Sequence, residues 1–332
     1  MRNNNKLIYK FRTNYLKNNF IFDKKNKILL FLLLVSFLFN ELLIHRIFEL
    51  DYKIIEKKKI DINTFFKNNK YISNGRITIF ANCDNIYCNY IPIFCASLLY
   101  SDKRNKTDIE IVTDLNELPE NILKSIEYLR KIYNSSTIKI RINVYKVKNN
   151  YAILNNQITR KNSIRFLVEP DIKNEYIFIS DIDIIYLVEN YYDNYLMDMF
   201  NRKSCYSNIV RRNTRALSGV HFSKWFCLYP ILLNKNIDLM INDENLLFIR
   251  LKELQIEIDY NTTYRPIFGI HLSVSRNSIV DPKSNITWEA KGKKMLWIKF
   301  KNTEIFRHIY SLLDIYIINK INKLEKYYEK NE

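Results

Sequence analysis

The stretch Tyr176–Asp183 (YIFISDID) decides the predicted fold. It begins as an apolar run typical of a buried strand and closes with two carboxylates spaced i, i+2, on Asp181 and Asp183. Where the chain turns at a strand end, both carboxylates can reach one hard cation. Mg²⁺ and Mn²⁺ accept oxygen ligands and leave positions free for a diphosphate. An acidic pair can also do no more than solvate a loop, but the buried strand before this one favours a metal site.

Strands and helices alternate on both sides of this stretch. We expect strands at Arg76–Ala81, Asp108–Thr113, Ile138–Val147, Tyr176–Ser180 and Ala216–Phe222. We expect helices at Tyr90–Tyr100, Leu118–Ile132, Ile164–Val168, Glu244–Leu254 and Thr303–Lys330. This alternation predicts an α/β domain with a mainly parallel central sheet. Ligands of such sheets bind beyond the carboxyl ends of the strands, which is where Asp181 and Asp183 fall.

Composition sets limits on the function. The chain has 332 residues, of which 47% are hydrophobic, so it can build a sizeable core. Its net charge of +17 invites a polyanionic partner, but +7 of that charge lies in residues 1–27. Because the remaining charge is diffuse and no nucleic-acid-binding motif is present, we expect no nucleic-acid partner. The glycine-rich phosphate loops of nucleotide-binding proteins are also missing from the sequence, so phosphates would be held in another way.

An apolar segment near the start predicts a membrane anchor. Residues 28–39 are uncharged and apolar, and Leu42-Leu43-Ile44 extends the run towards the roughly 17–25 residues of a membrane span. A signal peptide and a buried core helix are the alternatives. Basic residues stay cytoplasmic, so we expect a cytoplasmic tail at 1–27, a signal-anchor helix at 28–44 and a stalk at 45–74. This makes a single-pass protein whose body lies outside, or in the lumen of the Golgi or endoplasmic reticulum of a eukaryote.

The five cysteines do not decide between free thiols and a disulfide. They are odd in number and lack the spacing of metal ligands. Buried thiols are the first expectation, and one disulfide is the alternative.

Several blocks of residues occur in an order and spacing that matches a known group. Asp84, Tyr87 and Ser97-Leu98-Leu99 follow the first strand, and Arg165-Phe166-Leu167 begins sixteen residues before Asp181. The remaining blocks are Ile111–Asp114, Ser218–Phe222, Asp243–Leu247 and Gly269-Ile270-His271. Over roughly residues 76–276 the chain resembles the nucleotide-sugar glycosyltransferases with a D-x-D motif. It is most similar to the family that contains glycogenin and the bacterial lipopolysaccharide galactosyltransferases.

The resemblance implies a fold and a set of roles. It implies one Rossmann-like transferase domain of the GT-A type over residues 75–300, followed by an amphipathic helix over 301–332. The implied metal ligands are Asp181, Asp183 and His271. The implied nucleotide-sugar contacts are Asp84 and Tyr87 at the base, together with Arg165, Asp181 and Gly219. Asp243 or Glu244 would meet the donor sugar or the acceptor hydroxyl as the candidate catalytic acids.

One departure from the family lies after His271. The family continues there with a Gly and then Lys-Pro-Trp, whose Lys touches the diphosphate. Here Leu272-Ser273-Val274-Ser275-Arg276 follows, and Arg276 is the candidate replacement because a guanidinium binds phosphate in bidentate fashion.

The sequence therefore predicts a membrane-anchored, metal-dependent hexosyltransferase. It would move a hexose from a nucleotide-sugar, with UDP as the expected nucleotide, to a glycan, glycolipid or glycoprotein acceptor. Mn²⁺ or Mg²⁺ would be the cofactor, and the resemblance implies retention at the anomeric carbon. The alternative is a membrane-tethered binding protein with a degenerate, non-catalytic transferase fold.

Overall fold

The structure is a computed structural model that describes residues 75–149, 151–211, 215–231, 238–259, 269–272 and 292–331. The expected tail, anchor and stalk, and Arg276, lie outside these ranges. Within them, none of the helices has the length and apolar character needed to span a bilayer.

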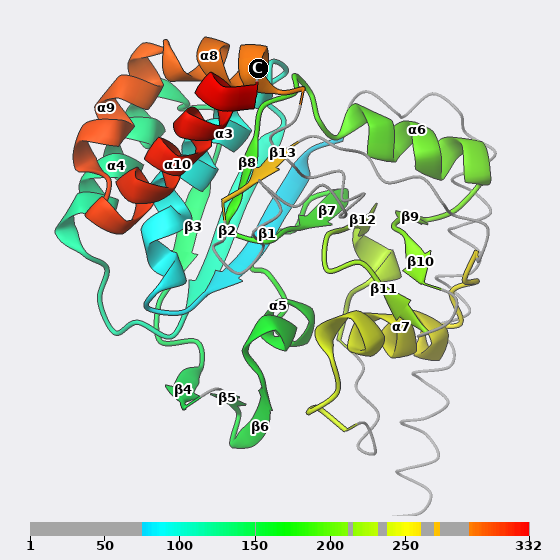
Figure 1. The fold of residues 1–332 in the computed structure, drawn as a ribbon. Coiled ribbons are helices and arrows are strands. Elements are labelled where there is room, and N and C mark those ends of the chain that lie inside the picture. Colours follow the sequence, from blue (N-terminus) through cyan, green and yellow to red (C-terminus); the bar gives the residue numbers. More distant parts are fainter. Residues whose placement is uncertain are drawn as a thin grey trace, which may run out of the picture. The chain divides into compact units, whose positions relative to one another are not determined.

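A six-stranded sheet forms the centre of the domain (Figure 1). Its strand order is β3 (Ile138–Arg141), β2 (Thr107–Thr113), β1 (Ile77–Cys83), β7 (Tyr176–Ile179), β12 (His221–Lys224) and β9 (Tyr206–Ser207). Neighbours from β3 to β7 are parallel, and β12 runs antiparallel to both β7 and β9. The predicted α/β class with a mainly parallel sheet is confirmed.

Helices cover both faces of this sheet. Figure 1 shows one group on one side, made of α3 (Ile91–Ser101), α4 (Glu120–Ile132), α8 (Lys294–Lys301), α9 (Glu304–Leu312) and α10 (Ile315–Asn331). The other side carries α5 (Ile164–Leu167) and α7 (Asp243–Glu253), and α6 (Asp193–Arg202) follows β8 (Ile184–Tyr186). Each face therefore has its own buried apolar cluster.

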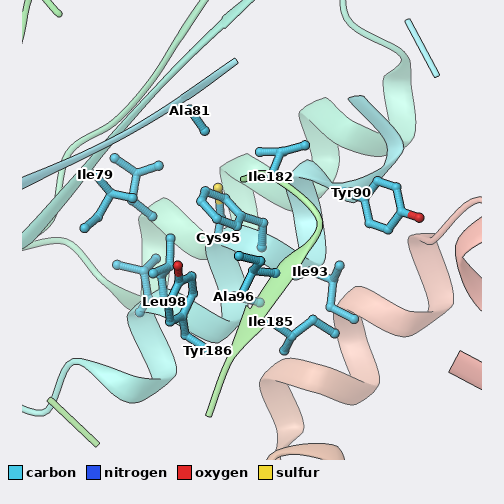
Figure 2. Close-up of a cluster of buried hydrophobic side chains, with 14 of the residues drawn as sticks. Ile79, Ala81, Tyr90, Ile93, Cys95, Ala96, Leu98, Ile182, Ile185 and Tyr186 are labelled. Carbon is cyan, nitrogen blue, oxygen red and sulfur yellow. The ribbon is translucent and has the colours of Figure 1, made fainter. Parts of the chain in front are cut away.

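The larger cluster explains why α3 is almost entirely apolar. Figure 2 shows Leu98 of α3 near Ile79 of β1 and Tyr186, all of them buried. The opposite side of α3 packs against α9. Because both sides are covered, the helix has no solvent-facing stripe. Its two buried serines are hydrogen-bonded, since the Ser97 hydroxyl donates to the Phe94 carbonyl oxygen and the Ser101 hydroxyl to the Tyr186 carbonyl oxygen.

Three sequence expectations about elements are wrong in detail. The expected strand Ile138–Val147 ends at Arg141, because Asn143 adopts a left-handed conformation (φ 52°) that turns the chain. The segment beyond it forms a separate three-stranded sheet of β4 (Lys146–Lys148), β5 (Tyr151–Leu154) and β6 (Gln157–Arg160).

The second expectation was one strand at Ala216–Phe222. The structure has β11 (Ala216–Leu217), which pairs with β10 (Val210–Arg211), and then β12, which begins at His221 in the central sheet. The break leaves Ser218-Gly219-Val220 as a connection between two sheets.

The third expectation was one amphipathic helix over 303–330. α9 ends at Leu312, Leu313 is extended, and the Asp314 carboxylate accepts a hydrogen bond from the Tyr316 amide at 2.7 Å as α10 begins. The apolar spacing continues through this break, so periodicity alone could not reveal it.

Candidate functional site

Carboxylates line the carboxyl edge of the sheet. β1 ends at Cys83 and β2 at Thr113, and these two residues are register partners. Asp84 and Asp114 follow directly, so they lie next to each other. β7 ends at Ile179, and the Ser180 amide still donates to Phe80, which places Asp181 at the same edge. The acidic pair of the sequence therefore lies where ligands of parallel sheets bind.

Arg165 of α5 joins two of the predicted site residues. One guanidinium nitrogen donates to Asp181, and another donates to Asp243 at 2.8 Å. Arg165 is only 4% exposed. Burial alone would lower the pKa of the guanidinium, but the Asp181 and Asp243 carboxylates raise it well above its ordinary value. The side chain is a permanent buried cation between two carboxylates.

Gly219 packs against this bridge. A β-carbon at this position would lie 2.5 Å from Arg165 Nη2 and 3.5 Å from Asp243 Oδ2. A contact as short as 2.5 Å would force the guanidinium to move. The resemblance implied that Gly219 contacts the nucleotide-sugar, and in the structure its backbone lies against the Arg165 side chain.

Asp183 meets His271 through a second pair of strands. β8 (Ile184–Tyr186) pairs antiparallel with β13 (Gly269–His271), and the Leu272 amide donates to the Asp183 carbonyl oxygen at 2.9 Å. His271 Nε2 consequently lies 3.4 Å from Asp183 Oδ1, with both side chains largely buried. Residues 88 positions apart in the chain are thus side by side, as the predicted site requires.

Gly269 permits this pairing. A β-carbon added at this position would lie 2.4 Å from Ile184 Cγ2 and 2.8 Å from the Ile185 carbonyl oxygen, so a larger residue would push β13 away from β8. Lys293 adds a contact from the other end, because its ammonium donates to the Gly269 carbonyl oxygen at 2.5 Å.

The predicted metal ligands are only partly assembled. Across the described ranges there is no group of three or more His, Cys, Asp and Glu side chains placed to hold a metal ion. Asp183 and His271 are adjacent, whereas the Asp181 carboxylate is engaged by Arg165. His271 Nδ1 is buried and has no hydrogen-bond partner among the described residues. Two carboxylates and an imidazole are a chemically suitable donor set for Mn²⁺.

The two candidate acids at the start of α7 point to different partners. Asn242 caps the helix by accepting from the Glu244 amide at 3.0 Å. The Asp243 carboxylate binds Arg165, and the Glu244 carboxylate pairs with Arg211 at 2.7 Å. Of the two, Asp243 belongs to the cluster with Arg165 and Asp181.

Asp84, at the end of the neighbouring strand β1, is held from two sides. Its Oδ1 accepts from the amides of Ile86 and Tyr87 at 3.2 and 3.1 Å. Its Oδ2 pairs with the Lys161 ammonium at 3.0 Å. Sequence reasoning did not single out Lys161. The available signal was its position four residues before Arg165, which puts both cations on neighbouring turns of one short helical segment.

Comparisons with known proteins give partial likenesses. No family model matches the chain, and a search of curated proteins finds no match. The glycosyltransferase GlyE of Streptococcus pneumoniae TIGR4 is 12% identical, with a TM-score of 0.30 over 46% of this chain and 34% of that chain. The mannosyltransferase PcManGT of Pyrobaculum calidifontis, in complex with GDP-Man and Mn²⁺, is 9% identical, with a TM-score of 0.32 over 53% and 54%.

TarS of S. aureus, residues 1–349, is 10% identical, with a TM-score of 0.36 over 53% of this chain and 55% of that chain. The matched part thus spans about a third to about half of the length of these proteins. Likenesses of this size assign neither a family nor an activity to the chain.

Proposed function

We propose that this protein is a glycosyltransferase that binds a nucleotide-sugar at the carboxyl edge of its central sheet. The observation that carries the proposal is the buried bridge from Asp181 through Arg165 to Asp243. Its members come from the end of β7, from α5 and from the start of α7. These three segments are blocks of the sequence resemblance, and they converge in space although 78 residues separate Arg165 from Asp243.

The bridge suits recognition of a sugar with several hydroxyl groups. Each carboxylate can accept hydrogen bonds from hydroxyls, and the guanidinium fixes the two carboxylates relative to each other. Because Arg165 is buried, it keeps one geometry and orders the site before the ligand arrives, which lowers the entropic cost of binding. Asp243 is then the candidate residue that faces the transferred sugar.

Asp181, Asp183 and His271 would hold a divalent cation, with Mn²⁺ favoured over Mg²⁺ because imidazole prefers the later metal. When bound, such a cation offsets the charge that develops on a leaving diphosphate. The 3.4 Å approach of His271 Nε2 to Asp183 Oδ1 supports this assignment. Asp181 would exchange part of its contact with Arg165 for the cation.

The finer features of the proposal come from the sequence. They are a UDP-hexose donor, a glycan-type acceptor, retention at the anomeric carbon, and membrane anchoring through residues 28–44. Full-length protein should stay with membranes after carbonate extraction, and its release into the soluble fraction would remove the anchor from the proposal. The alternative is a tethered protein that binds nucleotide-sugars without transfer, and the missing Lys-Pro-Trp segment favours it.

A panel of nucleotide-sugars tests the proposal. Full-length protein with Mn²⁺ is incubated with UDP-, GDP-, CDP- and ADP-sugars, and release of the nucleoside diphosphate is measured. We expect hydrolysis or transfer with at least one donor, and its loss in Asp243→Asn. Binding of a donor without release would favour the non-catalytic alternative. The absence of both binding and release across the panel would contradict the proposal.

A further inference from the structure

We propose that Lys161 is a nucleobase-binding residue, which together with Asp84 recognises a base edge carrying a ring N–H beside a carbonyl oxygen. The inference rests on the proposed function, because it assigns the base end of the same nucleotide-sugar site. Uracil and guanine carry such an edge, whereas cytosine and adenine do not.

The placement of Lys161 supports this role. Its ammonium lies 3.0 Å from Asp84 Oδ2, and the side chain is 26% exposed, so part of it is open to a ligand. The backbone is also fixed, since the Lys161 carbonyl oxygen accepts from the Asn82 side chain at 3.0 Å. Asn82 belongs to the end of β1, so one strand end positions both Asp84 and Lys161.

The Lys161 cation lies beside two neighbouring carboxylates. The strand register sets Asp84 beside Asp114, and both are acidic. Burial raises the pKa of Asp114, the neighbouring Asp84 carboxylate adds to this, and the Lys161 cation acts in the opposite direction. Lys161 offsets part of this negative charge, so a neutral base can bind at the edge without meeting two uncompensated carboxylates.

The donors and acceptors on this pair complement a lactam edge. An ammonium has three N–H donors, and the contact with Asp84 uses one of them. Asp84 Oδ1 accepts from two backbone amides, which leaves Oδ2, the oxygen beside the Lys161 ammonium, as the acceptor for a ring N–H. A ring N–H can donate to Oδ2 while Lys161 donates to the neighbouring carbonyl oxygen. The ring nitrogen of cytosine carries no proton and would face the carboxylate with a lone pair.

Calorimetry on the full chain with Mn²⁺ tests the inference. We expect wild-type protein to bind UDP or GDP more tightly than CDP and ADP. Lys161→Met should weaken binding of the preferred nucleotide by about tenfold or more, since a hydrogen bond from a charged group is lost, and the preference over CDP should shrink. Lys161→Arg should keep part of the affinity for the preferred nucleotide and part of the preference over CDP. Lys139→Met breaks a different Lys–Asp pair, with Asp171, and is the control that should leave affinity unchanged.

The outcomes separate this inference from the function on which it rests. If Lys161→Met binds UDP and GDP like the wild type, or if the wild type binds CDP or ADP equally well, the inference is overturned and the proposed function stands. A lower melting temperature with unchanged affinity would mark the Lys161–Asp84 pair as structural only. Lys161→Gln replaces the Met variant if that does not fold. If the wild type binds no nucleoside diphosphate, both the proposed function and this inference are wrong.

Discussion

Arg165 is the residue on which the geometry of the candidate site depends most. Its buried guanidinium compensates Asp181 and Asp243, so its removal leaves two partly buried carboxylates without their cation. We predict that Arg165→Met lowers the free energy of unfolding by about 3 kcal/mol, measured by urea denaturation, and abolishes donor binding. Arg165→Lys keeps the charge but not the planar guanidinium, so its stability and donor affinity should lie between those of the wild type and Arg165→Met.

The control for this prediction is Arg104→Met. Arg104 makes a similar two-pronged pair with Asp193, but both partners are well exposed, so its loss should cost no more than about 1 kcal/mol. Equal effects of the two substitutions would show that burial of the Arg165 bridge has no energetic consequence.

Gly219 allows a prediction about close packing against that bridge. In Gly219→Ala the new methyl group would meet Arg165 Nη2, so we expect a loss of about 1–3 kcal/mol in stability together with weaker donor binding. Gly292→Ala is the matched control. Gly292 has a φ of +74° with nothing near its β-position, so substitution there should cost about 1–2 kcal/mol through the backbone without weakening donor binding. Unchanged donor affinity in Gly219→Ala would contradict the role assigned to this glycine.

His221 predicts how stability depends on pH. It lies fully buried beside Asn208, and burial, aided by the Arg250 cation, lowers its pKa from 6.5 to about 3. The unfolded chain therefore binds a proton between pH 6.5 and 3 that the folded chain does not. The stability from this neutral imidazole is complete above pH 6.5 and falls as the pH drops, by at most about 1.4 kcal/mol per pH unit.

Urea denaturation between pH 7 and pH 4 measures this slope. His221→Gln cannot titrate and should show a shallower decline than the wild type. Parallel declines in the two proteins would mean that other groups dominate the acid sensitivity.

At the scale of elements, a disulfide fixes the far edge of the sheet. Cys205 precedes β9 and is bonded to Cys227, 22 residues later in a short 3₁₀ turn (Trp225–Cys227), while Cys83, Cys88 and Cys95 are buried thiols. Of the two expectations for the cysteines, buried thiols and one disulfide, each therefore holds for a different set of residues. Closing a loop of this length should stabilise the fold by about 3 kcal/mol through the unfolded state.

We predict that a reductant lowers the melting temperature of the wild type. Cys205→Ser should melt at the lower temperature whether the reductant is present or not. A wild type that melts at the same temperature with and without the reductant would contradict a stabilising disulfide.

Periodicity identified the elements that are long or fully buried. The strands around β1, β2 and β7 and the helices α3, α4 and α7 were predicted within a few residues, because burial on one or both faces leaves a clear apolar pattern. The same pattern could not locate the turn at Asn143 or the break at Leu313. In both cases local backbone geometry changes while the spacing of apolar residues does not.

Short elements and contacts between distant residues could not be predicted from the sequence. β8 and β13 have three residues each, too few for any period, and their pairing brings His271 to Asp183. The resemblance named the residues of the site. It could not show that Arg165 bridges Asp181 and Asp243, or that Glu244 turns to Arg211, because side-chain partners 16 to 78 residues apart depend on the folded arrangement.

At the scale of the whole domain, two sets of contacts converge on the D-x-D stretch. The face with α5 and α7 supplies Arg165 and Asp243 to Asp181. The β8–β13 pair supplies His271 to Asp183. The two carboxylates contact different partners, so the proposal gives them separate roles. Asp181 contacts both Arg165 and the cation, whereas Asp183 binds the cation only.

The most direct measurement of the central claim is calorimetry of UDP and GDP binding to the full chain, with and without Mn²⁺, in wild type and Asp183→Asn. The substitution keeps the side-chain shape and removes one charge from the proposed cation site. We predict that Mn²⁺ strengthens nucleotide binding to the wild type by about tenfold or more and gives no such gain in Asp183→Asn. Asp171→Asn, which removes an exposed carboxylate paired with Lys139, should behave like the wild type. Equal nucleotide affinity of wild type and Asp183→Asn in the presence of Mn²⁺ would contradict the account.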